Sequence, residues 1–382
     1  MTSGQQFTDF PQRVMPERVM LVIHSMNGGG SERQMSYLAN EIVGVSATSL
    51  VTLSETGTDR YPLDHRIERF GLGLTSQNGG LFRGLLGNTQ RIRRLRKLMR
   101  TWRPDVVVSF CDSTNVLSLI AFSGSVPVVI SERSDPRSQR MSRAWEWMRD
   151  LYYPKCRLCV AQTTEVGNYL IARRLVPSSH MRVIPSAIQI PEADTTLRDT
   201  HRQGIVPKTL MFLGRLSHTK RVDRLLVAWS RLRHHHRSWN LNIVGDGPDR
   251  AALQQQAAFL KLGETVQWSL WSDNVWESLR TASAYCLVSD YEGFPQSMLE
   301  AMAAGLPVAV LDCSPAIREV IADGENGLII DSEERISTVL DRLLSDSDLR
   351  LKLGGNAADR ARQFDWKFLG PRWIDAIASA IK

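Results

Sequence analysis

The chain has 382 residues, of which 43% are hydrophobic and 23% are charged, with a formal net charge of +7. This length favours two domains, and the absence of an apolar run of about 18 residues argues against a membrane-spanning helix. The first residues lack the apolar core of a signal peptide and the five cysteines are scattered, so we expect a cytoplasmic protein with reduced thiols.

The positive charge is concentrated in the first half of the chain. Residues 1–190 contain 24 Lys and Arg against 15 Asp and Glu, a net charge of +9, whereas the remainder has 23 against 25. This asymmetry indicates that the first half faces an anionic partner. Nucleic acid and an anionic membrane leaflet both fit the charge, which by itself does not choose between them.

After a loose lead-in over residues 1–17, strands and helices alternate through the first half. It opens with a strand, a glycine loop and a helix over 18–42, and a long basic helix ends at Pro104. Residues 191–207 are polar and rich in turn-forming residues, which predicts a linker. Further short apolar strands are expected over 45–53, 105–110, 126–132, 156–163 and 181–188.

The same alternation restarts at residue 208. It predicts an α/β protein with two Rossmann-like, doubly wound domains, at 18–190 and 208–365, and a C-terminal helix over 366–382 that packs back on the first domain. Because ligands of such sheets bind beyond the C-terminal strand ends, we expect the site in a central cleft between the halves. Strands of the second half are expected at the start of 209–232 and 241–260, and over 264–270, 283–289, 307–312 and 327–331.

Two carboxylates lie across a predicted strand-to-helix junction in the second half. Glu292 and Glu300 are separated by seven residues, and between them Gly293 allows a tight turn and Pro295 fits the first turn of a helix that closes at Gly305. The positive end of such a helix favours an anion. Carboxylates beside it fit a ligand with both phosphate and hydroxyl groups, such as a nucleotide sugar. An ordinary exposed helix start with a capping acid is the alternative.

A second loop of the same half carries two cations. Gly214 lets the backbone turn after a strand, Arg215 lies at the strand end and Lys220 opens the next helix. The arginine fork and the lysine point charge together could grip a diphosphate. A solvated basic loop is the alternative.

These segments together resemble family 4 retaining glycosyltransferases, which have the two-domain GT-B fold. The matching stretches over about 208–332 are FLGRLSHTKRVDRLLVAW, LNIVGDGPDRAALQ, SDYEGFPQSMLEAMAAGLPVAVLD and REVIADGENGLII. In the first half NGGGSERQMSYLAN, VVVSFCDSTNV and VVISERSDP are similar to bacterial members that extend polyprenol-diphosphate-linked oligosaccharides or exopolysaccharide units. The resemblance implies a retaining transferase that moves a sugar, expected to be UDP-linked, onto a lipid-linked or glycan acceptor at the inner face of the plasma membrane.

The resemblance also assigns roles in the second half. Glu300, the second glutamate of the E-x7-E motif, would accept hydrogen bonds from the nucleotide ribose, and Glu292 would face the donor sugar or the reaction centre. Arg215 and Lys220 would neutralise the leaving diphosphate. No D-x-D motif lies at a strand end of the first half, so no required metal is indicated. Backbone N–H groups near sugar and phosphate would come from Gly293, Phe294 and Pro295.

Site residues of the first half are less clearly marked. The loop Gly28, Gly29 and Gly30 resembles the one that meets the donor diphosphate and the acceptor, although a bare glycine triplet is a weak signal. Asp112, at a strand end, either lines the acceptor site or caps a helix. Glu132 and Arg133 lie where many family members carry a histidine, so the role of this position stays open. A hydrogen bond between Glu132 and a sugar hydroxyl is one expectation.

The segment 91–100 predicts a basic amphipathic helix, because Ile92, Leu95, Leu98 and Met99 fall on one stripe. The helix could lie on anionic lipid. Alternatively the stripe packs on the sheet and the cations are solvated, and both can hold. The cations expected at the membrane are Arg91, Arg93, Arg94, Arg96, Lys97 and Arg100.

Two rival functions remain open. The same fold serves nucleotide-sugar epimerases, and a non-catalytic protein of this fold could bind glycan or a sister transferase. The intact set of Arg215, Lys220, Glu292 and Glu300 argues against lost catalysis. Nucleic-acid binding explains the charge but not these residues, so we expect no nucleic-acid partner.

Overall fold

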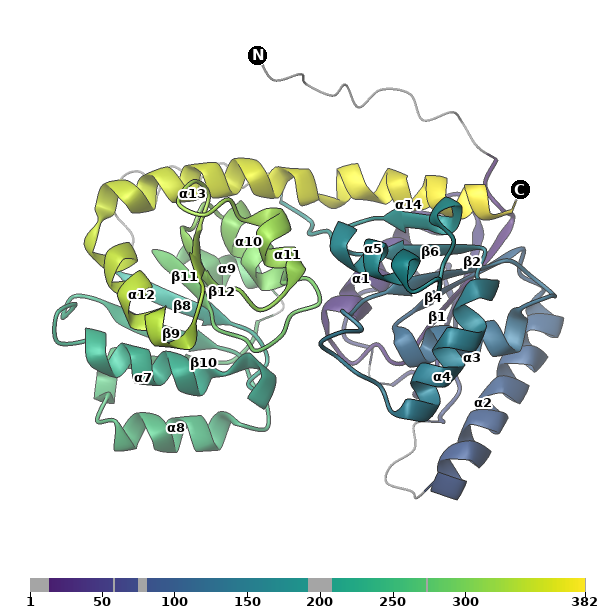
Figure 1. The fold of residues 1–382 in the computed structure, drawn as a ribbon, viewed down its shortest axis with the longest axis horizontal. Coiled ribbons are helices and arrows are strands. Elements are labelled where there is room, and N and C mark those ends of the chain that lie inside the picture. Colours follow the sequence, from purple (N-terminus) through teal and green to yellow (C-terminus); the bar gives the residue numbers. More distant parts are fainter. Residues whose placement is uncertain (1–13, 58, 75–80, 192–207, 273, 382) are drawn as a thin grey trace, which may run out of the picture. The chain divides into compact units, whose positions relative to one another are not determined.

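The computed structural model describes residues 14–57, 59–74, 81–191, 208–272 and 274–381, except for the side chains of 81–86 (Figure 1). The chain divides into two compact units: Met1–Pro185 with Lys367–Lys382, and Ser186–Trp366. Most of the expected lead-in and nearly all of the expected linker lie outside the described residues.

The first unit contains a parallel sheet of seven strands in the order β3-β2-β1-β4-β5-β6-β7. Most of its strands are buried along their length, as expected for a parallel sheet between helices. The order reverses between β1 and β4, and ligands of such sheets bind beside this reversal. The strands are β1 Arg18–Ile23, β2 Ala47–Thr52, β3 Glu68–Gly71, β4 Val106–Phe110, β5 Val128–Glu132, β6 Leu158–Ala161 and β7 Met181–Val183.

The C-terminal helix α14 joins this unit from Lys367 onward. Arg157 donates to the Ala380 carbonyl at 3.0 Å, Arg372 donates to Val183 O at 2.6 Å, and the rings of Phe110 and Trp373 are 5.3 Å apart. These contacts tie the end of the chain to strands formed much earlier. The helices are α1 Gly30–Ile42, α2 Leu81–Trp102, α3 Asp112–Phe122, α4 Arg143–Tyr152, α5 Thr164–Ala172 and α14 Trp366–Ala380, with short 3-10 turns at Tyr153–Lys155 and Ser178–His180.

The first unit ends at Pro185 rather than at residue 190. The cause is a backbone pairing of Ile188 within the second unit: its N–H donates to Phe364 O at 2.9 Å, and its carbonyl accepts from Trp366 N at 2.7 Å. Local sequence carries no sign of this pairing, because the partners are far apart in the chain.

The second unit has a six-stranded parallel sheet in the order β10-β9-β8-β11-β12-β13. Its strands are β8 Thr209–Leu213, β9 Asn240–Val244, β10 Val266–Ser269, β11 Ala284–Leu287, β12 Val308–Leu311 and β13 Leu328–Ile330. Its helices are α7 Val222–Leu232, α8 Arg250–Phe259, α9 Val275–Arg280, α10 Gln296–Ala303, α11 Pro315–Val320, α12 Ile336–Ser345 and α13 Ser347–Ala361, with 3-10 turns at His218–Lys220, Gly263–Thr265, Glu333–Arg335 and Arg362–Phe364.

The strands agree with the expected ones except for β3, which the sequence did not predict. Its sequence ERFG is short, and none of its residues is buried, because it is the edge strand of its sheet. It therefore lacks the apolar run that marks the inner strands. Trp102 ends α2 shortly before Pro104, as expected from the proline.

Candidate functional site

The second unit brings two of the predicted residues into direct contact. Lys220 Nζ lies 2.6 Å from Glu292 Oε1, and Ser289 Oγ donates to the same oxygen at 2.7 Å. Glu292 is 8% exposed, so its charge is compensated mainly by this lysine. Arg215 is exposed on the same loop as Lys220. Lys220 ends a 3-10 turn just before α7 instead of opening the helix.

Asp290 holds the loop of Lys220 against the loop of Glu292. Its N–H donates to Thr219 O at 2.9 Å, and its carboxylate accepts from Arg224 Nη1 at 2.5 Å and from Arg221 Nη1 at 3.3 Å. The backbone of Arg221 is left-handed, with φ 48°, and its side chain also pairs with Asp223 at 2.9 Å. This network fixes the distance between the two loops before any ligand arrives.

The segment that contains GDGP, residues 245–248, holds the loop of Arg215 by main-chain hydrogen bonds. Gly214 N donates to Val244 O at 3.0 Å and Leu216 N donates to Asp246 O at 2.9 Å. A Cβ at Gly245 would lie 1.9 Å from the carbonyl oxygen of Gly214, so no larger residue fits there without moving the loop. No local sequence pattern indicates these contacts, because their partners lie in another segment of the chain.

Helix α10 starts later than expected. Pro295 is its N-cap and makes no side-chain capping bond, so it is not in the first turn. The expectation that Pro295 offers a backbone N–H is wrong, since proline has none. Phe294 is 7% exposed and its ring lies 5.8 Å from that of Phe364, a packing role. The main-chain donors at this site are therefore those of Gly293, Phe294 and the first turn of α10.

Glu300 lies on α10 and is 2% exposed. The helix then closes at Gly305, whose φ is 82°: Gly305 N donates to Met302 O at 2.9 Å and Leu306 N donates to Ala301 O at 3.0 Å. This is a Schellman motif, the termination that the sequence predicted at this glycine. The burial of Glu300 excludes the reading of an exposed capping acid.

In the first unit, the glycine loop begins α1 beside two charged side chains. Gly28 has φ 106°, Gly29 is the N-cap and Gly30 is the first helical residue. A Cβ at Gly29 would lie 2.5 Å from Glu32 Oε2, and one at Gly28 would lie 2.8 Å from Arg60 Cδ. Arg60 is a basic neighbour of the loop that no motif marked, because it comes from the segment after β2.

Asp112, Glu132 and Arg133 come together at the ends of β4 and β5, which pair in parallel with Phe110 opposite Ser131. Asp112 is the first residue of α3, and its carboxylate accepts from Ser113 N at 2.6 Å. Arg133 is 7% exposed, with its guanidinium 5.1 Å from the centre of the Phe110 ring.

Glu132 lies within a buried polar network. It is 1% exposed, accepts from Tyr153 OH at 2.7 Å through Oε2 and from Ser134 Oγ at 3.2 Å through Oε1. Asn115 Nδ2 contacts the Tyr153 hydroxyl at 3.4 Å. Burial, together with the charge of Asp112, raises the pKa of the Glu132 carboxyl to about 7. No sequence motif marks Tyr153, because it reaches this site from the turn after α4.

We expect Glu132→Gln to remove a pH dependence of stability. Because the pKa of Glu132 rises from 4.5 to about 7 on folding, the folded state binds more protons between these values. Its free energy of unfolding therefore falls as pH rises through this window, by up to about 3 kcal/mol relative to the glutamine variant. Urea denaturation at a series of pH values measures the difference, and a difference that is constant with pH would contradict it.

The apolar stripe of α2 packs on the sheet. Leu95 and Trp102 are buried in the core of the first unit, and Ile92, Leu98 and Met99 pack against that core. The reading in which this stripe enters lipid is thereby corrected: any membrane contact of α2 uses its charged face.

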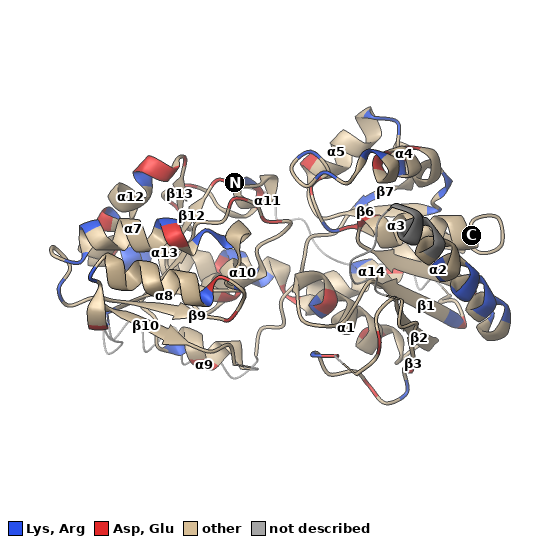
Figure 2. Cartoon of the chain, turned by 90° about the horizontal axis from the view of Figure 1, so that it is seen from below, with Lys and Arg blue, Asp and Glu red and all other residues tan. Residues whose placement is uncertain are grey.

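Three of the six cations in the 91–100 segment of α2 bind the protein itself. Arg91 donates to Leu74 O at 2.9 Å, Arg94 to Leu72 O at 2.8 Å and Arg96 to Ile120 O at 2.9 Å. The others, Arg93, Lys97 and Arg100, are exposed and have no side-chain partner among the described residues. Their i, i+4, i+7 spacing places them on one side of the helix, and we call these three residues the basic stripe. Figure 2 shows that Lys and Arg are frequent along α2.

In the described part of the chain, no group of three or more His, Cys, Asp and Glu side chains is arranged to hold a metal ion. Over the same residues, none of the helices is both long and apolar enough to cross a bilayer.

Two family models together match most of the chain. The model described as Glycosyltransferase Family 4 matches residues 28–190, and the model described as Glycosyl transferases group 1 matches residues 196–360. With the two Rossmann-like units and the residues above, they show the class: the chain belongs to the family 4 glycosyltransferases of the GT-B fold and is a glycosyltransferase.

The chain is similar to bacterial glycosyltransferases and to a solved structure with bound UDP and glucose. A Campylobacter jejuni protein is 24% identical over 366 residues, 94% of this chain and 98% of that protein. It is named as the alpha-1,4-N-acetyl-D-galactosaminyltransferase of GalNAc-alpha-(1->4)-GalNAc-alpha-(1->3)-diNAcBac-PP-undecaprenol. An uncharacterised glycosyltransferase of Haemophilus influenzae is 32% identical over 168 residues, 44% of this chain and 48% of that protein. The crystal structure of Anabaena HepE with UDP and glucose has the same fold, with TM-score 0.73 and 16% identity over 94% of this chain and 98% of that chain.

Proposed function

We propose that this glycosyltransferase uses a UDP-sugar, retains the anomeric configuration and needs no metal ion. The observation that carries the donor site is the Lys220–Glu292 pair beside the start of α10, in the unit matched by the second family model. A diphosphate leaving group gains negative charge as its bond to the sugar breaks. Arg215, Lys220 and the N-terminal end of α10 would supply fixed positive charge where that charge develops.

The carboxylates would divide the rest of the donor between them. Glu300 would accept hydrogen bonds from the ribose hydroxyls, and Glu292, already oriented by Ser289 and Lys220, would face the donor sugar. On donor binding, Lys220 would share its charge between Glu292 and the diphosphate. The leaving phosphate would then accept the proton of the attacking hydroxyl, so that sugar transfer occurs on one face. The UDP complex of Anabaena HepE supports the choice of nucleotide.

The acceptor would bind in the first unit. We infer that Asp112, Glu132 and Arg133 contact it, with the loop Gly28–Gly30 and Arg60 binding phosphate nearby. The name of the Campylobacter jejuni relative supports a polyprenol-diphosphate-linked oligosaccharide as the acceptor class. Such an acceptor is held in a membrane, and the basic stripe of Arg93, Lys97 and Arg100 would contact an anionic inner leaflet, each cation contributing about 1 kcal/mol.

The experiment is transfer from a panel of labelled nucleotide sugars onto membrane lipid extract. With the best donor, Glu300→Gln should raise the KM for the donor by about 10- to 100-fold, because a hydrogen bond to a charged group is lost. The matched control is Glu264→Gln, an exposed glutamate of the same unit, which should leave KM unchanged. Equal KM values for both variants would refute the ribose role, and a rearranged nucleotide sugar without transfer would indicate an epimerase.

A further inference from the structure

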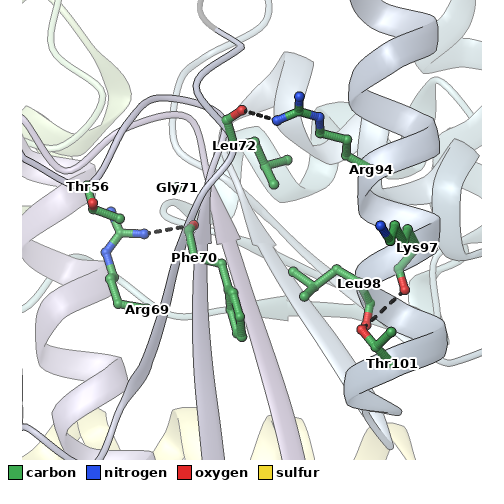
Figure 3. Close-up of a pocket in the computed structure, with 9 residues that line it drawn as sticks. All are labelled: Thr56, Arg69, Phe70, Gly71, Leu72, Arg94, Lys97, Leu98 and Thr101. Atoms are coloured by element: carbon green, nitrogen blue, oxygen red, sulfur yellow. Dashed lines mark hydrogen bonds between the residues drawn. The ribbon is translucent and has the colours of Figure 1, made fainter.

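A pocket on the rim of the first unit lies outside the donor and acceptor residues assigned above. It is an open pocket with a volume of about 620 Å³ that lies between the edge strand β3 and helix α2 (Figure 3). Its lining includes Phe70 and Leu72 from the strand side and Arg94, Lys97, Leu98 and Thr101 from the helix.

The pocket carries uncompensated positive charge. Of the described residues that line it, none is acidic. Arg69 also lines it but is neutralised by Asp59 at 2.7 Å. Arg94 donates one N–H to Leu72 O at 2.8 Å, and its other N–H groups have no partner among the described residues. Lys97 has no side-chain partner among the described residues, and its amino group lies on the side of α2 that faces β3 in Figure 3. Two cations therefore remain available to an anion.

The base of the same pocket is apolar. Phe70 and Leu98 are partly buried and pack against the core of the unit. Thr101 turns its hydroxyl to its own helix, where it donates to Leu98 O at 3.0 Å. A ligand that matches both the two cations and the apolar base of the pocket has an anionic group with a hydrocarbon segment next to it.

Lys97 belongs to the pocket and to the basic stripe at once. Arg93 and Arg100 flank it on the same side of α2, so a surface that meets the stripe also meets the pocket mouth. A phosphate in this pocket would thus come from the surface that the stripe attracts.

We propose that this pocket binds the phosphate of an anionic phospholipid head group. Lys97 and Arg94 hold the phosphate oxygens, and Phe70 and Leu98 contact the glycerol and the first acyl carbons. The inference rests on the proposed contact of this unit with an anionic leaflet and adds a specific lipid site to it. Inorganic phosphate offers the same charge without the apolar part and should bind more weakly.

The test is sedimentation of the full chain with phosphatidylcholine vesicles, with and without phosphatidylglycerol. Arg100→Gln removes one charge of the stripe outside the pocket and should weaken binding about fivefold. Lys97→Gln removes the same charge together with its hydrogen bonds to phosphate and should weaken binding about tenfold or more. Equal losses for these matched variants would overturn the pocket and leave the surface contact.

Thr101→Trp provides a second variant, which fills the pocket without changing the charge. We expect vesicle binding to weaken about tenfold, because the added ring excludes the phosphate and at least one of its charged hydrogen bonds is lost. Unchanged binding of the UDP-sugar is the control for folding. Wild-type binding by this variant would overturn the proposal. If the wild-type protein sediments equally with vesicles that contain and that lack phosphatidylglycerol, the membrane contact is refuted as well. If inorganic phosphate competes with vesicle binding as strongly as short-chain phosphatidylglycerol does, the bound phosphate need not belong to a lipid and the proposed lipid site is overturned.

Discussion

Lys220→Ala should lower the rate of sugar transfer by about 10²- to 10³-fold, the loss observed when one group aimed at developing charge is removed. The lysine lies 2.6 Å from Glu292, four residues before the start of α10, where the diphosphate is proposed to leave. The effect should appear in kcat as well as in kcat/KM, because the charge that it stabilises is greatest in the transition state. Initial rates over a range of donor concentrations measure it.

The same substitution also affects stability, so a control must separate the two effects. Without Lys220, the buried carboxylate of Glu292 loses its ion-pair partner, and we expect the free energy of unfolding to fall by about 2 kcal/mol, less than for a fully buried pair because the lysine is partly exposed. The double variant Lys220→Ala with Glu292→Gln removes both charges. It should recover most of the stability and none of the rate. Recovery of the rate would show that Lys220 acts only by balancing Glu292.

Gly245→Ala should be the most damaging substitution at a residue that contacts no ligand. Gly245 has φ 153°, and its new Cβ would lie 1.9 Å from the Gly214 carbonyl oxygen, so the loop that carries Arg215 must shift. We expect a loss of about 2 kcal/mol in unfolding free energy from the overpacking and about 10²-fold in transfer rate from a displacement on the order of 1 Å. Urea denaturation and initial rates give the two quantities.

Gly355→Ala is the matched control. This glycine lies in α13 with nothing near the position of an added Cβ, so alanine should stabilise the helix by up to about 1 kcal/mol and leave transfer unchanged. If Gly245→Ala behaves like Gly355→Ala, the GDGP segment does not position Arg215, and its role in the donor site must be abandoned.

The long helix α2 shows which features of the first unit could be predicted from the sequence and which could not. The pattern of 91–100 correctly predicted an amphipathic helix, but the same pattern allowed its apolar stripe to face lipid or the sheet. The core contacts of Leu95 and Trp102 decide for the sheet. In the sequence, Arg91, Arg94 and Arg96 cannot be distinguished from the other cations of this helix. In the structure they donate hydrogen bonds to backbone carbonyls and so stabilise the fold.

The sequence by itself determined the inner strands, the two α/β domains and the family, because buried parallel strands are local apolar runs and the family motifs are contiguous. It also predicted the strand-to-helix junction that carries Glu292 and Glu300. Only the tertiary structure decided which side chains meet: Lys220 reaches Glu292 across 72 residues, and Tyr153 reaches Glu132 across 21. The physical reason is that periodicity and turn residues act over one or two turns of chain, whereas ion pairs and buried hydrogen bonds depend on which loops the sheet order places side by side.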